Sequence, residues 1–364
     1  MSKFINIPKI ILEVLCMKTK IDKLLKKDID NLVREVTIDL INYLYEYGFD
    51  LDILIDKINS TEFIFFDDNL FKKNIFYRVG KKIKKKELNL IGYEGAFIPI
   101  IDLNENQELV IYKKICAINL DGPIRKDNPH FKQKIIHELL HLLSAKDSLE
   151  KIEKYSYYYT GFSKTAFFKN KNNSYRNSDA GDDEFNEAVT DLLADNIYRD
   201  IYDDDFILTC TMEGKIRRPC INSYYFNKML IKVLNLLAYG TNDTTHLLLS
   251  YMTNDLNIYL EQVESNLRLS YIDLKNVMYI SQYEMEVYLK TKSQNSMNYM
   301  KENFMRIFML SLSSLERVYD HMNISKEEKE EWENYLKNNI KFLCYFPVYK
   351  NMQQDIENVV EAIL

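Results

Sequence analysis

The sequence predicts an α+β fold in which helices come first, a small mixed sheet follows, and a larger set of helices ends the chain. Apolar residues recur every three or four positions over residues 21 to 58, and short runs rich in Ile, Phe, Tyr and Val follow them. Strand-like runs stop at about residue 220. We therefore expect an N-terminal helical segment over residues 1–60, a core over 61–201 and a mostly α-helical C-terminal domain over 202–364.

The first segment predicts one or two amphipathic helices. Residues 21 to 58 read IDKLLKKDIDNLVREVTIDLINYLYEYGFDLDILIDKI, with Gly48 inside the run. Glycine weakens a helix and favours a turn, so we expect the break there.

The next segment predicts a sheet of three to five strands. Its runs of β-branched and aromatic residues are separated by Gly, Asn and Asp: TEFIFFDDN, NIFYRVG, ELNLIGYEGAFIPII and ELVIYKKICAINLDG.

A buried helix is predicted after KDNP. Asn128 or Asp127 can cap its first amides, and Pro129 suits its first position. Leucine and isoleucine then cover more than one face as far as Leu143, which is typical of a helix inside the core. Residues 152 to 182 are predicted to be irregular, a tyrosine-rich patch followed by a long polar surface loop. Another helix follows in DEFNEAVTDLLADNIYRDI, and the C-terminal domain is predicted to be a helical bundle.

The buried helix holds two of the five histidines of the chain, His137 and His141. Residues four apart lie on one face of a helix, so the two imidazoles can grip one ion. Glu138 is turned by about 100° from His137. This is the H-E-x-x-H arrangement, in which two histidines bind zinc and the glutamate acts as general base on a zinc-bound water. The alternative is a pair of hydrogen-bonded core histidines, but two histidines and an acid are costly to bury without a partner.

A second pair of polar residues supplies a candidate third ligand. Glu187 and Asp191 are also four apart, on a helix that otherwise carries an apolar stripe. One carboxylate can bind the metal while the other orients a ligand histidine by accepting its second N–H. Two alternatives stay open: both acids can belong to a solvated face, or Glu184, one turn earlier, can be the ligand.

The two elements resemble those of the zincin metallopeptidases, and among these the gluzincins, whose third ligand is a glutamate. The resemblance is carried by HELLH at residues 137–141 and by NEAVTD at residues 186–191, the latter similar to the N-E-x-x-[ST]-D element of the thermolysin-like branch. It implies that His137, His141 and Glu187 bind Zn²⁺, that Glu138 activates water, and that Asp191 supports a ligand, with His137 the expected one.

The resemblance also implies an architecture. A small sheet precedes the first active-site helix, its edge strand receives an extended substrate, and a helical domain closes the far side of the cleft; CAINLDG, residues 116–122, is the expected edge strand. The similarity is confined to roughly residues 130 to 200, and the gap between the elements is longer than in thermolysin. The acidic group DAGDDE lacks the spacing of an EF-hand loop and is expected to be surface. No motif identifies an oxyanion-stabilising group; the candidates are His246, Tyr175 and a tyrosine within residues 155–159.

Composition limits the partners. The formal net charge is −6 and no arginine-rich stripe occurs, so we expect no nucleic acid partner. Five scattered cysteines without a CxxC pair indicate a reducing compartment. No run of about 18 apolar residues is present, and Glu13 interrupts the apolar N-terminus, so we expect a cytoplasmic protein without a membrane span. The sequence does not indicate an oligomeric state.

Together these features predict a zinc-dependent metallopeptidase that acts on a peptide or protein substrate. A narrowly selective intracellular, toxin-like protease is one alternative. A non-catalytic zinc-binding regulatory or interaction protein is another. Structural zinc sites usually close the fourth position with Cys or His, and neither lies near the two elements.

Overall fold

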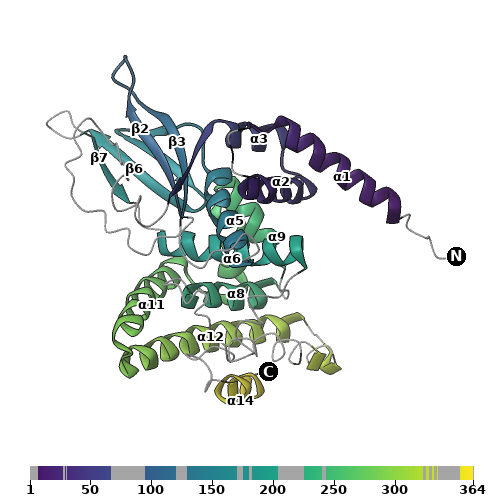
Figure 1. Cartoon of the computed structure of the whole chain (residues 1–364). Helices are drawn as coiled ribbons and strands as arrows, with labels where there is room; N and C mark the ends of the chain where they lie inside the picture. The colour runs from purple at the N-terminus through teal and green to yellow at the C-terminus, as the bar shows by residue number, and fades with distance from the viewer. Residues whose placement is uncertain are drawn as a thin grey trace. The chain divides into compact units, whose positions relative to one another are not determined.

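The computed structural model describes residues 7–27, 29, 31–66, 95–119, 129–169, 175–179, 183–203, 225–239, 243–322, 325–327, 330–331, 334 and 353–363 (Figure 1). Its contacts divide the chain into two compact units, the first formed by Met1–Ser178 with Ala194–Asp204 and the second by Asp179–Leu193 with Asp205–Leu364. Helix α6 (Asp183–Tyr202) is continuous across this division. The three-segment division stays a prediction.

Three helices begin the first unit: α1 (Ile7–Leu24), α2 (Asn31–Glu46) and α3 (Leu51–Asn59). The predicted break at Gly48 is confirmed, because Gly48 has φ +89° in the turn between α2 and α3. Asp50 then caps α3, since its Oδ1 accepts from the backbone N–H groups of Asp52 and Ile53 at 2.9 and 3.1 Å.

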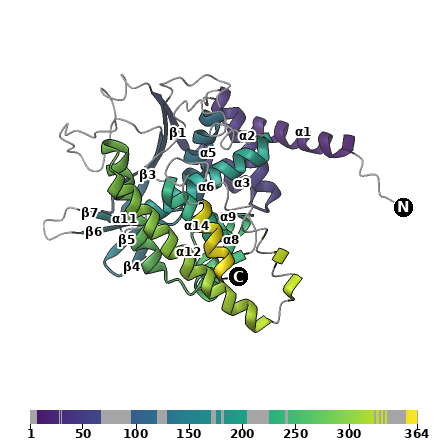
Figure 2. The same cartoon turned by 90° about the horizontal axis from the view of Figure 1, so that it is seen from below.

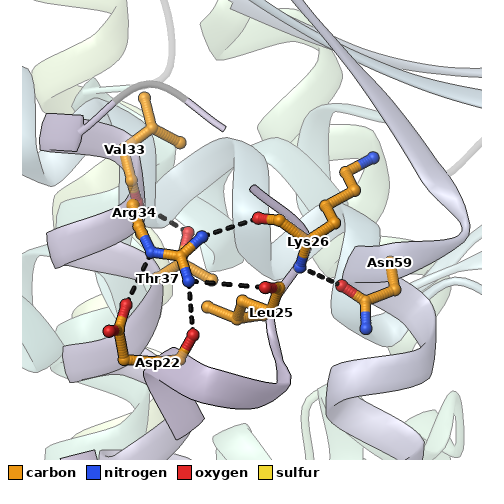
Figure 3. A network of polar contacts seen from close by, with 7 residues as sticks. All are labelled: Asp22, Leu25, Lys26, Val33, Arg34, Thr37 and Asn59. Carbon is orange, nitrogen blue, oxygen red and sulfur yellow. Dashed lines mark hydrogen bonds and ion pairs between the residues drawn. The ribbon is translucent and has the colours of Figure 1, made fainter. Parts of the chain in front are cut away.

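Arg34 on α2 ties the end of α1 to the helices that follow (Figure 3). Its Nε donates to Asp22 Oδ1 at 2.6 Å, its Nη1 to the carbonyl of Lys26 at 2.6 Å, and its Nη2 to the carbonyls of Asp22 and Leu25. Asn59 adds a link to α3 by accepting from the Lys26 N–H at 2.8 Å. These contacts satisfy carbonyls and an amide that the end of a helix leaves without intrahelical partners.

A three-stranded sheet of β1 (Thr61–Phe66), β2 (Gly95–Leu103) and β3 (Leu109–Asn119) has the order β1-β3-β2. Strand β1 is parallel to β3 and β2 is antiparallel to it, so the expected small mixed sheet is confirmed. The stretch NIFYRVG lies outside the described residues. The expectation that CAINLDG forms the edge strand is wrong: its described part, Cys116–Asn119, belongs to β3 and pairs on both sides. The uninterrupted run ICAI is typical of a strand buried on both faces.

The prediction of an irregular segment over residues 152 to 182 is also wrong. The chain forms a second sheet of order β4-β5-β6-β7, with strands Glu150–Ile152, Tyr155–Thr160, Ser163–Lys169 and Tyr175–Asp179. Gly161, at φ +54°, opens a two-residue turn between β5 and β6. Tyr158 and Phe167 hold this hairpin in the core by packing with Ile101, Leu109 and Ala145.

Helix α5 (Pro129–Ser144) is the central helix of the first unit, in contact with α2, α3, β2 and β3 (Figures 1 and 2). It starts at Pro129, and its predicted burial on more than one face is confirmed: Ile135, Ile136, Leu139, Leu140, Leu142 and Leu143 are all buried. Lys57 caps its C-terminus by donating to the carbonyls of Leu143 and Ala145 at 2.6 and 2.8 Å. Burial lowers the pKa of Lys57, and the charge of Asp147 opposes that shift.

The second unit is helical throughout its described part, which together with the two sheets confirms the α+β class. After the first half of α6 come α8 (Tyr225–Tyr239), α9 (Thr245–Thr253), α10 (Leu256–Leu267), α11 (Tyr271–Thr291), α12 (Gln294–Met322) and α14 (Gln353–Ile363). The largest fully buried side chains described in this unit are Tyr251, Tyr259, Phe185, Phe304 and Phe308. Among the described helices, none is long and apolar enough to span a bilayer.

We predict that Arg34→Met lowers the free energy of unfolding by about 1–3 kcal/mol, because the substitution leaves several helix-end carbonyls without a donor. The measurement is urea denaturation followed by circular dichroism. Arg199→Met is the matched control, since Arg199 forms an ion pair with the adjacent Asp200 at 3.5 Å and both side chains are more than 40% exposed. Equal losses in the two variants would contradict the role of Arg34.

Candidate metal centre

Two imidazoles converge on α5. His137 and His141 are one turn apart, their Nε2 atoms lie 3.1 Å from each other, and their rings meet at 71° with centroids 4.9 Å apart. Two nitrogens that bind one zinc ion at about 2.0–2.1 Å in tetrahedral geometry lie roughly 3.3 Å apart. The helix therefore presents the two nitrogens at nearly the separation that one ion requires.

Glu187 on α6 completes a cluster of three. One ligand atom from each of His137, His141 and Glu187 lies within 4.8 Å of the other two. An ion bound by all three would bring these atoms to roughly 3.3 Å, a closure of about 1.5 Å that side-chain rotation can supply. Over the described ranges, this is the one group of three or more His, Cys, Asp or Glu side chains close enough to share an ion. It contains Glu187 and does not contain Glu184.

The second half of α6 is held in the first unit by contacts that also involve the start of α5. Gln133 donates to Asp195 Oδ1 at 3.0 Å, and Lys132 lies 4.2 Å from the ring centre of Tyr202. The hydroxyl of Tyr202 donates to Asp39 on α2 at 2.9 Å. These contacts all lie within the first unit.

Three polar side chains on each of α5 and α6 are spaced four residues apart. They are Gln133, His137 and His141 on α5 and Glu187, Asp191 and Asp195 on α6. Residues four apart rise about 6 Å along one face of a helix. Each set of three therefore lies on one face of its own helix.

Glu138 is held against the start of β2. Its side chain is buried, with 9% exposed, and a Cβ added at Gly95 would lie 2.5 Å from its Oε1 and 2.6 Å from its Cγ. No other residue type could stand at position 95 without moving the carboxylate. Burial raises the pKa of Cys116 on β3 well above its usual value, and the charge of Glu138 adds to the shift. The glycine in YEGAF was the available signal, because glycine inside a strand often marks a close approach.

Asp191 is a buried ion-pair partner. Its Oδ2 lies 2.7 Å from Nζ of Lys228 on α8, and the two side chains are 7% and 4% exposed. The expected support of His137 by Asp191 stays a prediction. Sequence analysis missed Lys228, although a lysine inside YFNKMLIKVLNLLAY, a helix apolar on nearly every face, is as unusual as the histidines of α5.

The other candidates lie in varied surroundings. His246 is exposed and stacks on Tyr239, with ring centres 4.7 Å apart. Tyr158 is buried in the core under the second sheet, while the rings of Tyr157 and Tyr159 are covered by Lys164. The side chains of Tyr175 and of DAGDDE, except that of Glu184, lie outside the described part of the structure. An oxyanion role for any of them stays a prediction.

Comparison with known proteins adds no family to these findings. No protein-family model, no curated protein and no solved structure matches the chain. The resemblance to gluzincins therefore rests on two sequence elements and on the cluster that brings His137, His141 and Glu187 together.

We predict that Glu187→Gln weakens zinc binding by about 100-fold or more, since a neutral amide replaces the only charged ligand of the three. Glu184→Gln is the matched control on the same helix and should leave the affinity within about threefold of the parent. Competition with a chromophoric chelator measures both. The reverse ranking of the two variants would identify Glu184 as the ligand.

Proposed function

We propose that the protein is a zinc-dependent metallopeptidase of the gluzincin type. The observation that carries the proposal is the cluster of His137, His141 and Glu187 with the carboxylate of Glu138 beside it on the same helix. Three protein ligands are typical of a catalytic zinc site, whereas structural sites use four. When bound, zinc supplies Lewis acidity to the carbonyl of a peptide bond.

The donor set supports zinc as the metal. Two imidazoles and one carboxylate suit zinc, whereas calcium and magnesium prefer six or more oxygen ligands or octahedral oxygen shells. Cys116 is buried and lies outside the cluster. Imidazoles bind zinc as neutral groups, so metal affinity at such a site depends on pH.

Glu138 is the proposed general base. It would take a proton from the attacking water and later deliver that proton to the leaving amine. The contact with Gly95 restricts where its carboxylate can lie, which serves catalysis because proton transfer depends on short donor–acceptor distances.

Strand β2 is the proposed docking edge for an extended peptide. Among the described strands β2 is the antiparallel edge of its sheet: it pairs with β3 on one side, and its first residue, Gly95, lies against Glu138. An extended substrate can add to such an edge through backbone hydrogen bonds, while side-chain pockets give selectivity. A shift of register between Ile100 and Ile101 bends β2 away from regular pairing, which would limit the length of the docked segment.

We predict that Glu138→Gln keeps zinc but slows hydrolysis by about 100-fold to 10,000-fold, since the amide cannot accept the proton. Mass spectrometry of new peptide termini, first from a peptide library and then from cell extract, measures the activity, with metal content determined in parallel. Turnover of many peptides would exclude the narrowly selective alternative. A parent protein that holds zinc and cleaves nothing would favour the alternative of a non-catalytic zinc-binding protein.

We predict that Gly95→Ala leaves zinc affinity within about threefold and lowers the hydrolysis rate by about 100-fold, the scale of a 1 Å misplacement. The added methyl group pushes Glu138 and does not belong to a ligand. In the Glu138→Gln background the same change should have little further effect on the rate. Full activity of the single variant would show that Glu138 acts from another position.

A further inference from the structure

Lys228 is a charged residue at a buried position of α8, where an apolar residue is usual. It is 4% exposed, and its neighbours Leu230, Ile231 and Leu234 on α8 are fully buried. Removing an ammonium from water costs several kcal/mol unless an opposite charge and good geometry compensate. Asp191 supplies both, because Lys228 donates to its Oδ2 at 2.7 Å.

Stability alone gives a weak reason for this pair. A well-packed leucine or methionine pair of similar volume is often as stable as a buried ion pair, or more so. Asp191 lies one turn from Glu187 on the same face of α6, and neighbouring side chains at this spacing are about 5–6 Å apart at Cβ. The buried lysine is therefore linked to the metal cluster through one carboxylate.

Charge balance favours the same link. Glu138, Glu187 and Asp191 are three carboxylates within buried or half-buried surroundings. A divalent ion balances two of them, and one ammonium balances the third. Without Lys228, Asp191 would be a buried carboxylate without this counter-charge, which favours its neutral form.

We propose that Lys228 is a positioning residue of the metal centre: it supplies the counter-charge of Asp191 and fixes the plane of its carboxylate, and it thereby increases the affinity of the two-histidine site for its metal. A carboxylate has acceptor sites on both oxygens, so Asp191 can bind Lys228 through Oδ2 and still accept from a histidine N–H. This inference rests on the metal binding of the proposed function and is independent of whether the protein hydrolyses peptides.

A double-mutant cycle on zinc affinity tests the proposal. Lys228→Met and Asp191→Asn should each raise the zinc dissociation constant by about 10–100-fold, as loss of partners behind metal ligands typically does. In the Asp191→Asn background, Lys228→Met should add less than about twofold, because its route to the metal is already removed. Lys228→Arg keeps the charge and should retain affinity within about fivefold of the parent. Lys301→Met is the control, since Lys301 pairs with Asp355 on α14 at 3.0 Å.

Thermal unfolding of the metal-free variants separates this role from a structural one. A Lys228→Met variant that unfolds at a lower temperature but binds zinc like the parent would overturn the proposal. Tighter zinc binding by Lys228→Met, or additive losses of zinc affinity in the double variant, would overturn it too. If Lys228→Met does not fold, the other two variants decide. Weaker zinc binding by Asp191→Asn together with unchanged binding by Lys228→Arg supports the proposal. Unchanged binding by Asp191→Asn together with weaker binding by Lys228→Arg overturns it. A parent chain that binds no zinc would overturn the proposed function as well, whereas indifference to Lys228→Met overturns this inference alone.

Discussion

The burial of polar groups along α5 is the constraint on which the rest of the site depends. A helix with leucine and isoleucine on several faces buries Glu138 and His141 and leaves His137 half-buried. Each of these groups then needs a partner from the protein or from an ion, since a buried polar group without one costs free energy. The neighbouring elements supply those partners: β2 approaches Glu138 with a bare backbone, and α6 brings Glu187 to the imidazoles.

The three side chains that could share an ion all come from helices. His137 and His141 lie on α5 and Glu187 lies on α6. The second half of α6 lies beside the start of α5, where Gln133 donates to Asp195 and Lys132 meets the ring of Tyr202. Candidate ligands on helices rather than on loops favour well-defined ligand positions.

Helical periodicity and local chemistry predicted the parts of the fold that depend on nearby residues. The break at Gly48, the start of α5 at Pro129 and its burial, and the pairing of His137 with His141 follow from spacing along the chain, whereas Glu187 was expected beside them from the resemblance to gluzincins. The order of the strands could not be predicted in this way. The described part of CAINLDG pairs on both sides, and the residues of a strand do not by themselves indicate which strands lie beside it. The hairpin at Gly161 carried a local signal that the tyrosine-rich composition obscured. Lys228 lies 37 residues from Asp191, and no motif connects them.

Gly95 has a consequence for how freely this chain can vary. Every one of the other nineteen amino acids carries a β-carbon, so a glycine codon at this position has no conservative neighbour. A substitution here is therefore unlike one at most surface positions, because every alternative must displace a buried carboxylate. Among natural variants of the chain, a side chain at this one position would mark the copies in which Glu138 has moved.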